Sequence, residues 1–461
     1  MEKKHSLNVF FLTLINIATI LSIENWPFLA AYEFSSLFFL GLTAIAFFIP
    51  VSLVSAELAS AFPERGGIFN WVKAAFGQRL AFFSVLLLWI SNLVWFPTLL
   101  SYFSVSFSYA FAAWDPNPLW LHFLSIGLIS ASVVLSHKFG LAVMSRISSW
   151  ALLFGTVLPG LLIILGGVYW IYTGQPSQIE CSWSALWPRL NGMDDLVFLS
   201  GVIISFSGME MNAMHACNVD SPGRNYPRAI LFSGTIIFLF SLLGTLSIGV
   251  AVPREKIDIV SSSIEALSHY LHFFGWGSLL PLIALGIGLG GVGGITVWIA
   301  GSNQGLLAAL QQGDFGFTSL VDNGKNYSFR LMGIQAILAL ALSTIALAMP
   351  DMNGFYWILT ALSSQLYLCM YLLMFSAAIT LRIYRPEVKR PYRIPGGTKA
   401  VIAIGGLGLI SSLFGFGISF VPPSQIQTGS LLTYESFFLV VWLSIIWAGF
   451  FYRRSRSEVR V

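Results

Sequence analysis

Long apolar stretches separated by short polar ones repeat along the whole chain. A membrane-spanning helix needs about 20 mostly apolar residues, and twelve stretches are almost free of Asp, Glu, Lys and Arg. They cover residues 5–23, 34–56, 80–114, 116–137, 147–179, 196–219, 229–253, 266–313, 331–350, 352–381, 400–434 and 436–452. The pattern predicts an all-α membrane protein with twelve transmembrane helices. The stretch 266–313 is long enough to include a loop or an external helix.

The basic residues are unevenly distributed between the polar connections. With the N-terminus inside, 21 of the 24 Lys and Arg residues fall on one side of the membrane, and only Arg189, Arg254 and Lys256 fall on the other. Cytoplasmic connections of membrane proteins are enriched in Lys and Arg. The distribution therefore predicts an even number of spans and two cytoplasmic termini.

The composition excludes several other classes of protein. The chain is 56% hydrophobic and 10% charged, whereas a soluble domain carries roughly 25% charged residues. The net charge of +4 comes from short connections between apolar stretches, so we expect no binding to nucleic acid. No polar linker divides the chain, and residues 1–461 are predicted to form one transmembrane domain.

Cofactor and enzyme chemistry have no visible basis. The six His and three Cys residues lack metal-ligand spacing, and no paired acid and base or nucleophile grouping stands out. We therefore expect no metal, no cofactor and no enzyme activity.

Two predicted spans are interrupted by polar and helix-breaking residues at matching places. The first contains Ser22, Glu24, Asn25 and Pro27, and the sixth contains Ser205, Ser207, Gly208 and Glu210. Interrupted helices in corresponding positions of two halves indicate a transport site in an inverted-repeat carrier. The pattern predicts repeats at about 6–175 and 195–383, followed by two further helices at about 398–452. The alternative is that each interruption is a packing kink.

The two interruptions also predict the chemistry of the site. A broken helix exposes unpaired N–H groups at one end and unpaired C=O groups at the other, which suit a carboxylate and an ammonium. Glu24 and Glu210 could hold a proton, accept a substrate ammonium or cap exposed N–H groups. Acids inside a membrane are costly and mark functional sites. Glu57, near the cytoplasmic end of the second span, is predicted to be a structural or gating residue.

The eighth span carries glycines every four residues. Gly286, Gly290 and Gly294 form one stripe of a helix, which predicts close packing against another helix. Thr296 and Trp298 follow one turn later and could border a cavity.

Aromatic residues provide further candidates. Tyr367 and Tyr371 are four residues apart in the tenth span, so they share one helix face. We expect them to line a cavity, because hydroxyl groups facing lipid are costly; an interfacial aromatic belt is the alternative. Trp95 in the third span is a weaker candidate for gating.

Several motifs resemble one family. Ala56-Glu-Leu-Ala and Gly66-Gly-Ile-Phe-Asn-Trp71 are similar to its span 2–3 signature, and Gly208-Met-Glu210 with Ser221-Pro-Gly-Arg224-Asn-Tyr-Pro227 to its span 6 and following loop. Lys389-Arg-Pro-Tyr-Arg-Ile-Pro-Gly-Gly397 is similar to its span 10–11 loop, and Val421-Pro-Pro-Ser-Gln-Ile follows span 11. Together they resemble the amino acid–polyamine–organocation superfamily, and its glutamate/γ-aminobutyrate antiporter branch in particular.

The resemblance implies a five-plus-five inverted-repeat fold of the leucine-transporter type (LeuT-like), with discontinuous helices 1 and 6. It implies amino-acid exchange by alternating access in a plasma membrane, which we expect to be a bacterial inner membrane. Tyr367 and Tyr371 match tyrosines that line that branch's transport path, and Gly208 and Glu210 match its unwound span 6. A homodimer is a candidate assembly.

Three departures from that branch affect specificity. Glu24 stands where the branch has a tyrosine, and Gly294 stands where it has a glutamate. The chain ends ten residues after Phe451, so we expect no equivalent of the branch's long C-terminal plug. Glutamate specificity and acid-gated opening therefore do not carry over.

Three functions are compatible with these residues. The first is an amino-acid exchanger or proton-coupled carrier, in which Glu24 would favour a zwitterion or a cationic amine over a dianion. The second is an amine or polyamine carrier. The third is a non-transporting membrane sensor, a class that usually has an added soluble domain.

Overall fold

The computed structural model describes residues 8–64, 66–111, 123–124, 126–134, 149–190, 192–211, 219, 221–312, 328–344 and 352–451. The elements assigned in these ranges are helical. The first half contains α1 (Val9–Ile20), α2 (Trp26–Ala30), α3 (Ser36–Thr43), α4 (Ile49–Ala61), α5 (Ile68–Phe76), α6 (Gln78–Ala110), α8 (Leu158–Tyr172) and α9 (Trp183–Leu186). The second half contains α10 (Leu199–Ser205), α11 (Pro222–Ala251), α12 (Ser262–Phe273), α13 (Leu280–Gln312), α14 (Phe329–Ser343), α15 (Met352–Tyr384), α16 (Gly397–Ile418) and α17 (Leu431–Phe451). Single 3-10 or π-helical turns complete the list: η1 (Glu33–Ser35), η2 (Ala44–Phe48), η3 (Leu153–Val157), η4 (Met193–Leu196), η6 (Arg254–Lys256) and η7 (Gly277–Leu279).

The helices have the length and composition of membrane spans. Among the described residues, seven are long and apolar enough to cross a bilayer, and four shorter apolar helices accompany them. The shorter ones include Val9–Ile20 and Leu199–Met211, the two segments predicted to be interrupted. The protein is therefore a multi-pass membrane protein, while the count of twelve spans stays a prediction. Half of the predicted fourth span, 116–137, lies outside the described residues.

The expected division of the stretch 266–313 is confirmed, whereas the predicted stretch 400–434 was too wide. The stretch 266–313 divides into the separate helix α12 and the long helix α13, joined by a turn at Gly275. Within the stretch 400–434, the helix α16 ends at Ile418, and the next helix, α17, begins at Leu431. Apolar composition alone does not mark helix ends where the connecting segment is also apolar.

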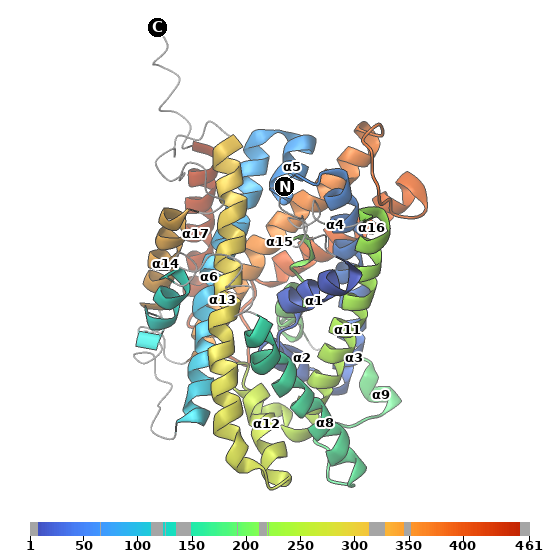
Figure 1. Cartoon of the computed structure of the whole chain (residues 1–461). Helices are drawn as coiled ribbons and strands as arrows, with labels where there is room; N and C mark the ends of the chain where they lie inside the picture. Colours follow the sequence, from blue (N-terminus) through green and yellow to red (C-terminus); the bar gives the residue numbers. More distant parts are fainter. Residues whose placement is uncertain are drawn as a thin grey trace.

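The core of the molecule is built on α6. This helix packs against α13 and α15, and Figure 1 shows α6 and α13 side by side over nearly the full height of the molecule. Two glycines of α13 make the approach close: a Cβ added at Gly288 or Gly291 would clash with the rings of Phe107 and Phe103, respectively. Small residues at helix contacts let backbones approach in membranes, where packing drives association.

The predicted glycine stripe is confirmed at two of its three positions. A Cβ on Gly290 would lie 2.7 Å from the Cα of Gly155 in η3, and one on Gly286 would lie 3.3 Å from the carbonyl oxygen of Phe154. A Cβ on Gly294 would meet nothing within 4 Å among the described residues. Close packing is therefore confirmed for Gly286 and Gly290 and stays a prediction for Gly294, because residues 135–148, which precede η3, lie outside the described part of the chain.

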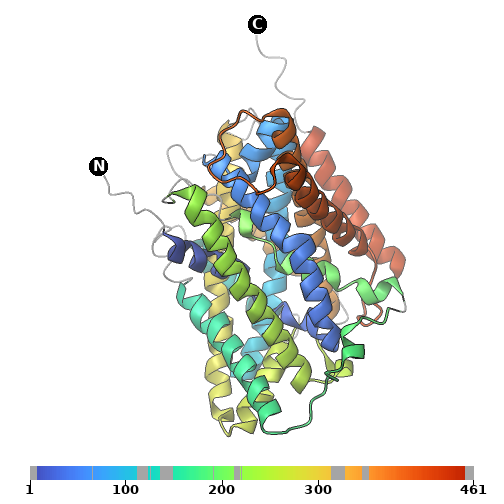
Figure 2. The same cartoon turned by 90° about the vertical axis from the view of Figure 1, so that its right-hand side faces the viewer.

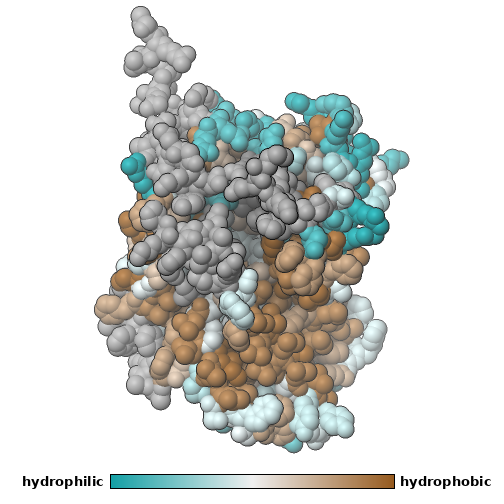
Figure 3. All heavy atoms as spheres, viewed as in Figure 1, coloured by the Kyte–Doolittle hydropathy of each residue, from teal (hydrophilic) through white to brown (hydrophobic). Residues whose placement is uncertain are grey.

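The outer surface of the helices is apolar. Leu165, Val168, Leu439 and Leu443 are more than half exposed, as expected for side chains that face lipid. Figure 2 shows α8 beside α11, and the run α3–η2–α4 between α11 and α16. Figure 3 shows hydrophobic residues over the middle and lower part of one face, and hydrophilic residues gathered at its upper end.

Candidate functional site

The first predicted interruption is a real break in the helix. Residues 21–25 separate α1 from α2, and Asn25 is the N-cap residue of α2 without a capping side-chain hydrogen bond. The carbonyl of Ile23 in the break accepts hydrogen bonds from the hydroxyl of Ser263 at 2.8 Å and from the N–H of Trp26 at 3.4 Å. The local cause is Pro27 at the second position of α2, which cannot donate to a preceding turn.

The second interruption lies directly beside the first. The helix α10 ends at Ser205, and Gly208 has φ +114°, a conformation that side chains disfavour. A Cβ at Gly208 would lie 3.1 Å from Thr19 and 3.4 Å from Ile20, at the end of α1. The two broken helices therefore meet at Gly208, as the paired interruptions predicted.

Two tyrosines of α15 bind the acid that follows this break. The hydroxyl of Tyr367 donates to Glu210 Oε1 at 2.6 Å, and that of Tyr371 donates to Glu210 Oε2 at 2.5 Å. The N–H of Gly208 donates to the Tyr371 hydroxyl at 3.0 Å. All of these groups are buried. One carboxylate is thus held by two phenols, and one phenol also satisfies a backbone N–H freed by the break.

Glu24 lies in the first break and is also buried. Its carboxylate lies beside Ser22 and within electrostatic reach of Tyr102 on α6 and Tyr356 on α15. The hydroxyl of Tyr102 is buried and has no hydrogen-bond partner among the described residues. This acid therefore has a polar but incompletely satisfied environment, unlike Glu210.

The remaining predicted residues are two tryptophans, two serines and one threonine. Trp298 and Trp95 form an edge-to-face pair with ring centroids 5.5 Å apart, and Trp298 packs close to Gly208. Ser207 lies beside the hydroxyl of Tyr367. The hydroxyl of Ser205 donates to the carbonyl of Val202 in its own helix. Thr296, on the helix that carries Trp298, is buried.

Two residues of the site were missed in the sequence. Tyr102 carries a hydroxyl inside an apolar span, the same signal that selected Tyr367, so it was available to sequence reasoning. Ser263 reaches Ile23 from α12, 240 positions away along the chain. No local pattern identifies such a contact.

A second cluster, made of Glu57 and the arginines around it, lies at the end of the molecule that is predicted to be cytoplasmic. Glu57 on α4 accepts from Arg382 at 2.9 Å, from Arg390 at 3.2 Å and from the N–H of Ile394 at 2.8 Å. Arg390 also donates to the carbonyls of Leu381, Arg385 and Val388, which folds the connection after α15. Burial lowers the pKa of Arg390, and the negative charge of Glu57 opposes that shift. These contacts are compatible with the predicted structural or gating role of Glu57.

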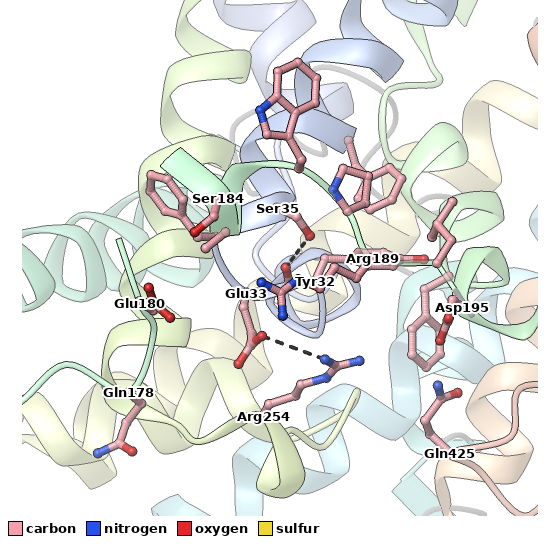
Figure 4. Close-up of a pocket in the computed structure, with 17 residues that line it drawn as sticks. Tyr32, Glu33, Ser35, Gln178, Glu180, Ser184, Arg189, Asp195, Arg254 and Gln425 are labelled. Carbon is pink, nitrogen blue, oxygen red and sulfur yellow. Dashed lines mark hydrogen bonds and ion pairs between the residues drawn. The ribbon is translucent and has the colours of Figure 1, made fainter. Parts of the chain in front are cut away.

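The opposite end has a cavity of about 320 Å³. Figure 4 shows positively and negatively charged side chains around the cavity. They come from segments that follow α2, precede α10 and precede α12. Glu33 and Arg254 form an ion pair with a distance of 3.8 Å between Oε2 and Nη1. In the part of the chain that the structure describes, no group of three or more His, Cys, Asp or Glu residues could hold a metal ion.

Comparison with known proteins agrees with this geometry. Residues 7–445 match the family model described as amino acid permease. An uncharacterized transporter of Legionella pneumophila is 34% identical over 97% of each chain. The glutamate/gamma-aminobutyrate antiporter of Lactococcus lactis subsp. lactis is 28% identical over 95% of this chain and 88% of its own length. A probable agmatine/putrescine antiporter of the same organism is 25% identical over 89% and 87%.

The fold is shared with a more distant solved structure. A manganese transporter of Eremococcus coleocola superposes with a TM-score of 0.59 over 96% of this chain and 92% of its own, at 14% identity. That identity supports the fold alone. The family match and the relatives cover nearly the whole chain, and their motifs are those quoted from the sequence. The chain belongs to the amino acid permease family of the amino acid–polyamine–organocation superfamily.

Proposed function

We propose that this protein carries an amino acid or a close derivative across the membrane by alternating access, as an exchanger or a proton-coupled carrier. The observation that carries the proposal is the carboxylate of Glu210, held by Tyr367 and Tyr371 where the two broken helices meet. A cargo that enters between the breaks would find freed backbone N–H and C=O groups. The antiporters among the relatives support the same reaction class.

Tyr371 links the cargo site to the gate. Its hydroxyl bonds both Glu210 and the N–H of Gly208. If cargo or a proton changes the hydrogen bonding of Glu210, Tyr371 transmits that change to the backbone of the break. Trp298 packs beside the same glycine, Trp95 packs edge-to-face against Trp298, and the pair would close over the cargo.

A second candidate is an amine or polyamine carrier. The observation that favours it is Glu24, a second buried acid whose neighbour Tyr102 has an unsatisfied hydroxyl. One carboxylate at each of the two breaks would suit a diamine, and the agmatine/putrescine antiporter relative points to the same chemistry. The substrate screen below distinguishes the two functions. Ser22, Asn25, Ser205, Ser207 and Thr296 complete the proposed site.

Counterflow in proteoliposomes tests the proposal. Vesicles loaded with one amino acid or amine are assayed for uptake of the labelled compound, with the proteinogenic L-amino acids, γ-aminobutyrate and putrescine as the panel. Tyr371→Phe removes two hydrogen bonds, one of them to a carboxylate, and each is worth about 1–2 kcal/mol. We expect exchange at least tenfold slower than wild type, because about 1.4 kcal/mol corresponds to a factor of ten.

Tyr384→Phe is the matched control, since Tyr384 lies on the same helix but is exposed. It should exchange like wild type. If the wild-type protein exchanges none of the compounds in the panel, the proposed transport is overturned. Equal exchange by Tyr371→Phe and Tyr384→Phe would remove the clamp from the mechanism.

The membrane arrangement is part of the proposal. The distribution of basic residues supports both termini in the cytoplasm of a bacterial inner membrane, with the cavity beside Arg254 on the outer face. The five-plus-five repeat, the single domain and a homodimer stay predictions.

A further inference from the structure

The cavity at the predicted outer end lies between the outer ends of both broken helices. Tyr32 and Glu33 follow α2, and Asp195 and Phe198 precede α10. Its volume of about 320 Å³ is at the lower end of the roughly 300–1,000 Å³ typical of small-molecule sites. A second cavity of about 590 Å³ shares Phe198 and Arg254 with it.

The ion pair across this cavity is loose. Glu33 and Arg254 are 3.8 Å apart, and their side chains are 42% and 55% exposed. Exposed pairs of this kind contribute little to stability. Glu33 also has φ +51°, in the left-handed region that costs free energy for a residue with a side chain. The chain therefore holds a weak ion pair in a strained position at the mouth of the molecule.

Further charges line the same cavity. Arg189 and Glu180 lie on its wall, and neither forms an ion pair within 4.0 Å with the residues that the structure describes. Asp195, in η4 before the start of α10, lies within electrostatic reach of Tyr32. Arg189 and Arg254 are two of the three basic residues on the predicted outer side, so the cavity concentrates the rare positive charge of that face.

We propose that this cavity is an outer binding site for a zwitterionic amino acid, which separates Glu33 from Arg254. The carboxylate of the ligand pairs with Arg254 and Arg189, and its ammonium pairs with Glu33 and Asp195. One loose ion pair is exchanged for two, and the net charge of the cavity does not change. A diamine has no group for the arginines, so the site selects against it.

This proposal rests on the proposed function and narrows its substrate class. Binding in the cavity loosens the contact between the segment after α2 and the turn that contains Arg254, so that the ligand itself opens the outer end. The cargo then reaches the central breaks from an outer site that selects for a carboxylate.

Sided transport kinetics test the outer site. Arg189→Gln and Arg254→Gln are measured in proteoliposomes of known orientation, with an amino acid that exchanges in the counterflow screen, and with putrescine as the probe without a carboxylate. We expect the KM for entry at the outer face to rise about fivefold, the size of one exposed charge contact. The KM at the inner face and any KM for putrescine should stay within about twofold.

Lys256→Gln is the matched control. Lys256 is an exposed cation in the same turn as Arg254 but does not line the cavity. An equal rise at both faces, or the same KM in the arginine variants and in Lys256→Gln, would overturn the proposal. The proposal would also be overturned if the wild-type protein transported putrescine and no amino acid. In that case the protein would still be a transporter.

A binding measurement separates the two proposals. Equilibrium binding of a labelled amino acid to the full-length protein in nanodiscs is compared between wild type and the arginine variants. Binding that depends on Arg254 in a protein without exchange activity would leave the outer site and remove the proposed function. If the protein exchanges amino acids but binds them equally in wild type and all variants, only the outer-site proposal is removed.

Discussion

Replacing Glu57 with Gln keeps the shape of the side chain but removes the negative charge from between two buried arginines. Arg382 and Arg390 each place a guanidinium nitrogen within 3.2 Å of one carboxylate oxygen, and the N–H of Ile394 donates to the other. An amide has one oxygen to accept these donors, and its NH₂ group faces at least one of them. The variant therefore leaves two buried cations without a counter-charge.

The size of the effect follows from this burial. Removing one partner of a buried ion pair costs about 3–5 kcal/mol. Unfolding entropy of about 2.1 cal/mol/K per residue over 461 residues amounts to about 1 kcal/mol/K. Glu57→Gln should therefore lower Tm by about 3–5 °C.

The assay is thermal unfolding of purified protein in nanodiscs, followed by circular dichroism. Glu64→Gln is the control, because Glu64 is exposed and close in sequence, and its Tm should match wild type. The double variant Glu57→Gln/Arg382→Met should lose less than the sum of the two single variants, by about 1–3 kcal/mol of coupling. A Tm for Glu57→Gln within the error of Glu64→Gln, or strictly additive losses, would refute the reasoning.

Two further predictions concern packing and pH. Gly290→Ala should lower Tm by about 1–3 °C, because its Cβ would lie 2.7 Å from the Cα of Gly155 and overpacking costs about 1–3 kcal/mol. Gly294→Ala, whose Cβ would meet none of the described residues within 4 Å, should equal or exceed wild type, and the reverse order would contradict the contact. Burial raises the pKa of Glu265 on α12 above its usual 4.5, while His269 opposes the shift. A raised acid pKa gives stability that is lost as pH rises through it, so Glu265→Gln should unfold at a higher Tm than wild type at pH 7.5 and at the same Tm near pH 4. Parallel Tm curves over this pH range would rule out the shift.

The breaks could be predicted because each carries its own local cause. Pro27 cannot donate to a preceding turn, Gly208 tolerates positive φ, and an acid such as Glu24 is too costly in a membrane without a specific environment. These are properties of single residues in an apolar context. The pairing of Tyr367 and Tyr371 followed from helix periodicity, which places residues four apart on one face.

The partners of these residues could not be predicted in the same way. Glu57 meets Arg390 across more than 300 positions, and the contact between Ser263 and Ile23 spans 240. Which of several cations in a loop reaches a given acid depends on how whole helices pack, and packing in a membrane depends on shape rather than on a hydrophobic pattern.

The two ends of the molecule carry ion pairs of very different strength, and this difference would order the proposed transport cycle. At the predicted inner end, one carboxylate is buried with two arginines and a backbone N–H, and loss of one partner from such a buried ion pair costs about 3–5 kcal/mol. At the predicted outer end, Glu33 and Arg254 are half-exposed and 3.8 Å apart, a pair worth about 0–1 kcal/mol. A ligand with one exposed charge contact supplies enough free energy to open the outer end but not the inner one. Opening inward therefore needs either contacts made at the central breaks or a motion that carries α4, α15 and their connection together, which keeps Glu57 paired throughout.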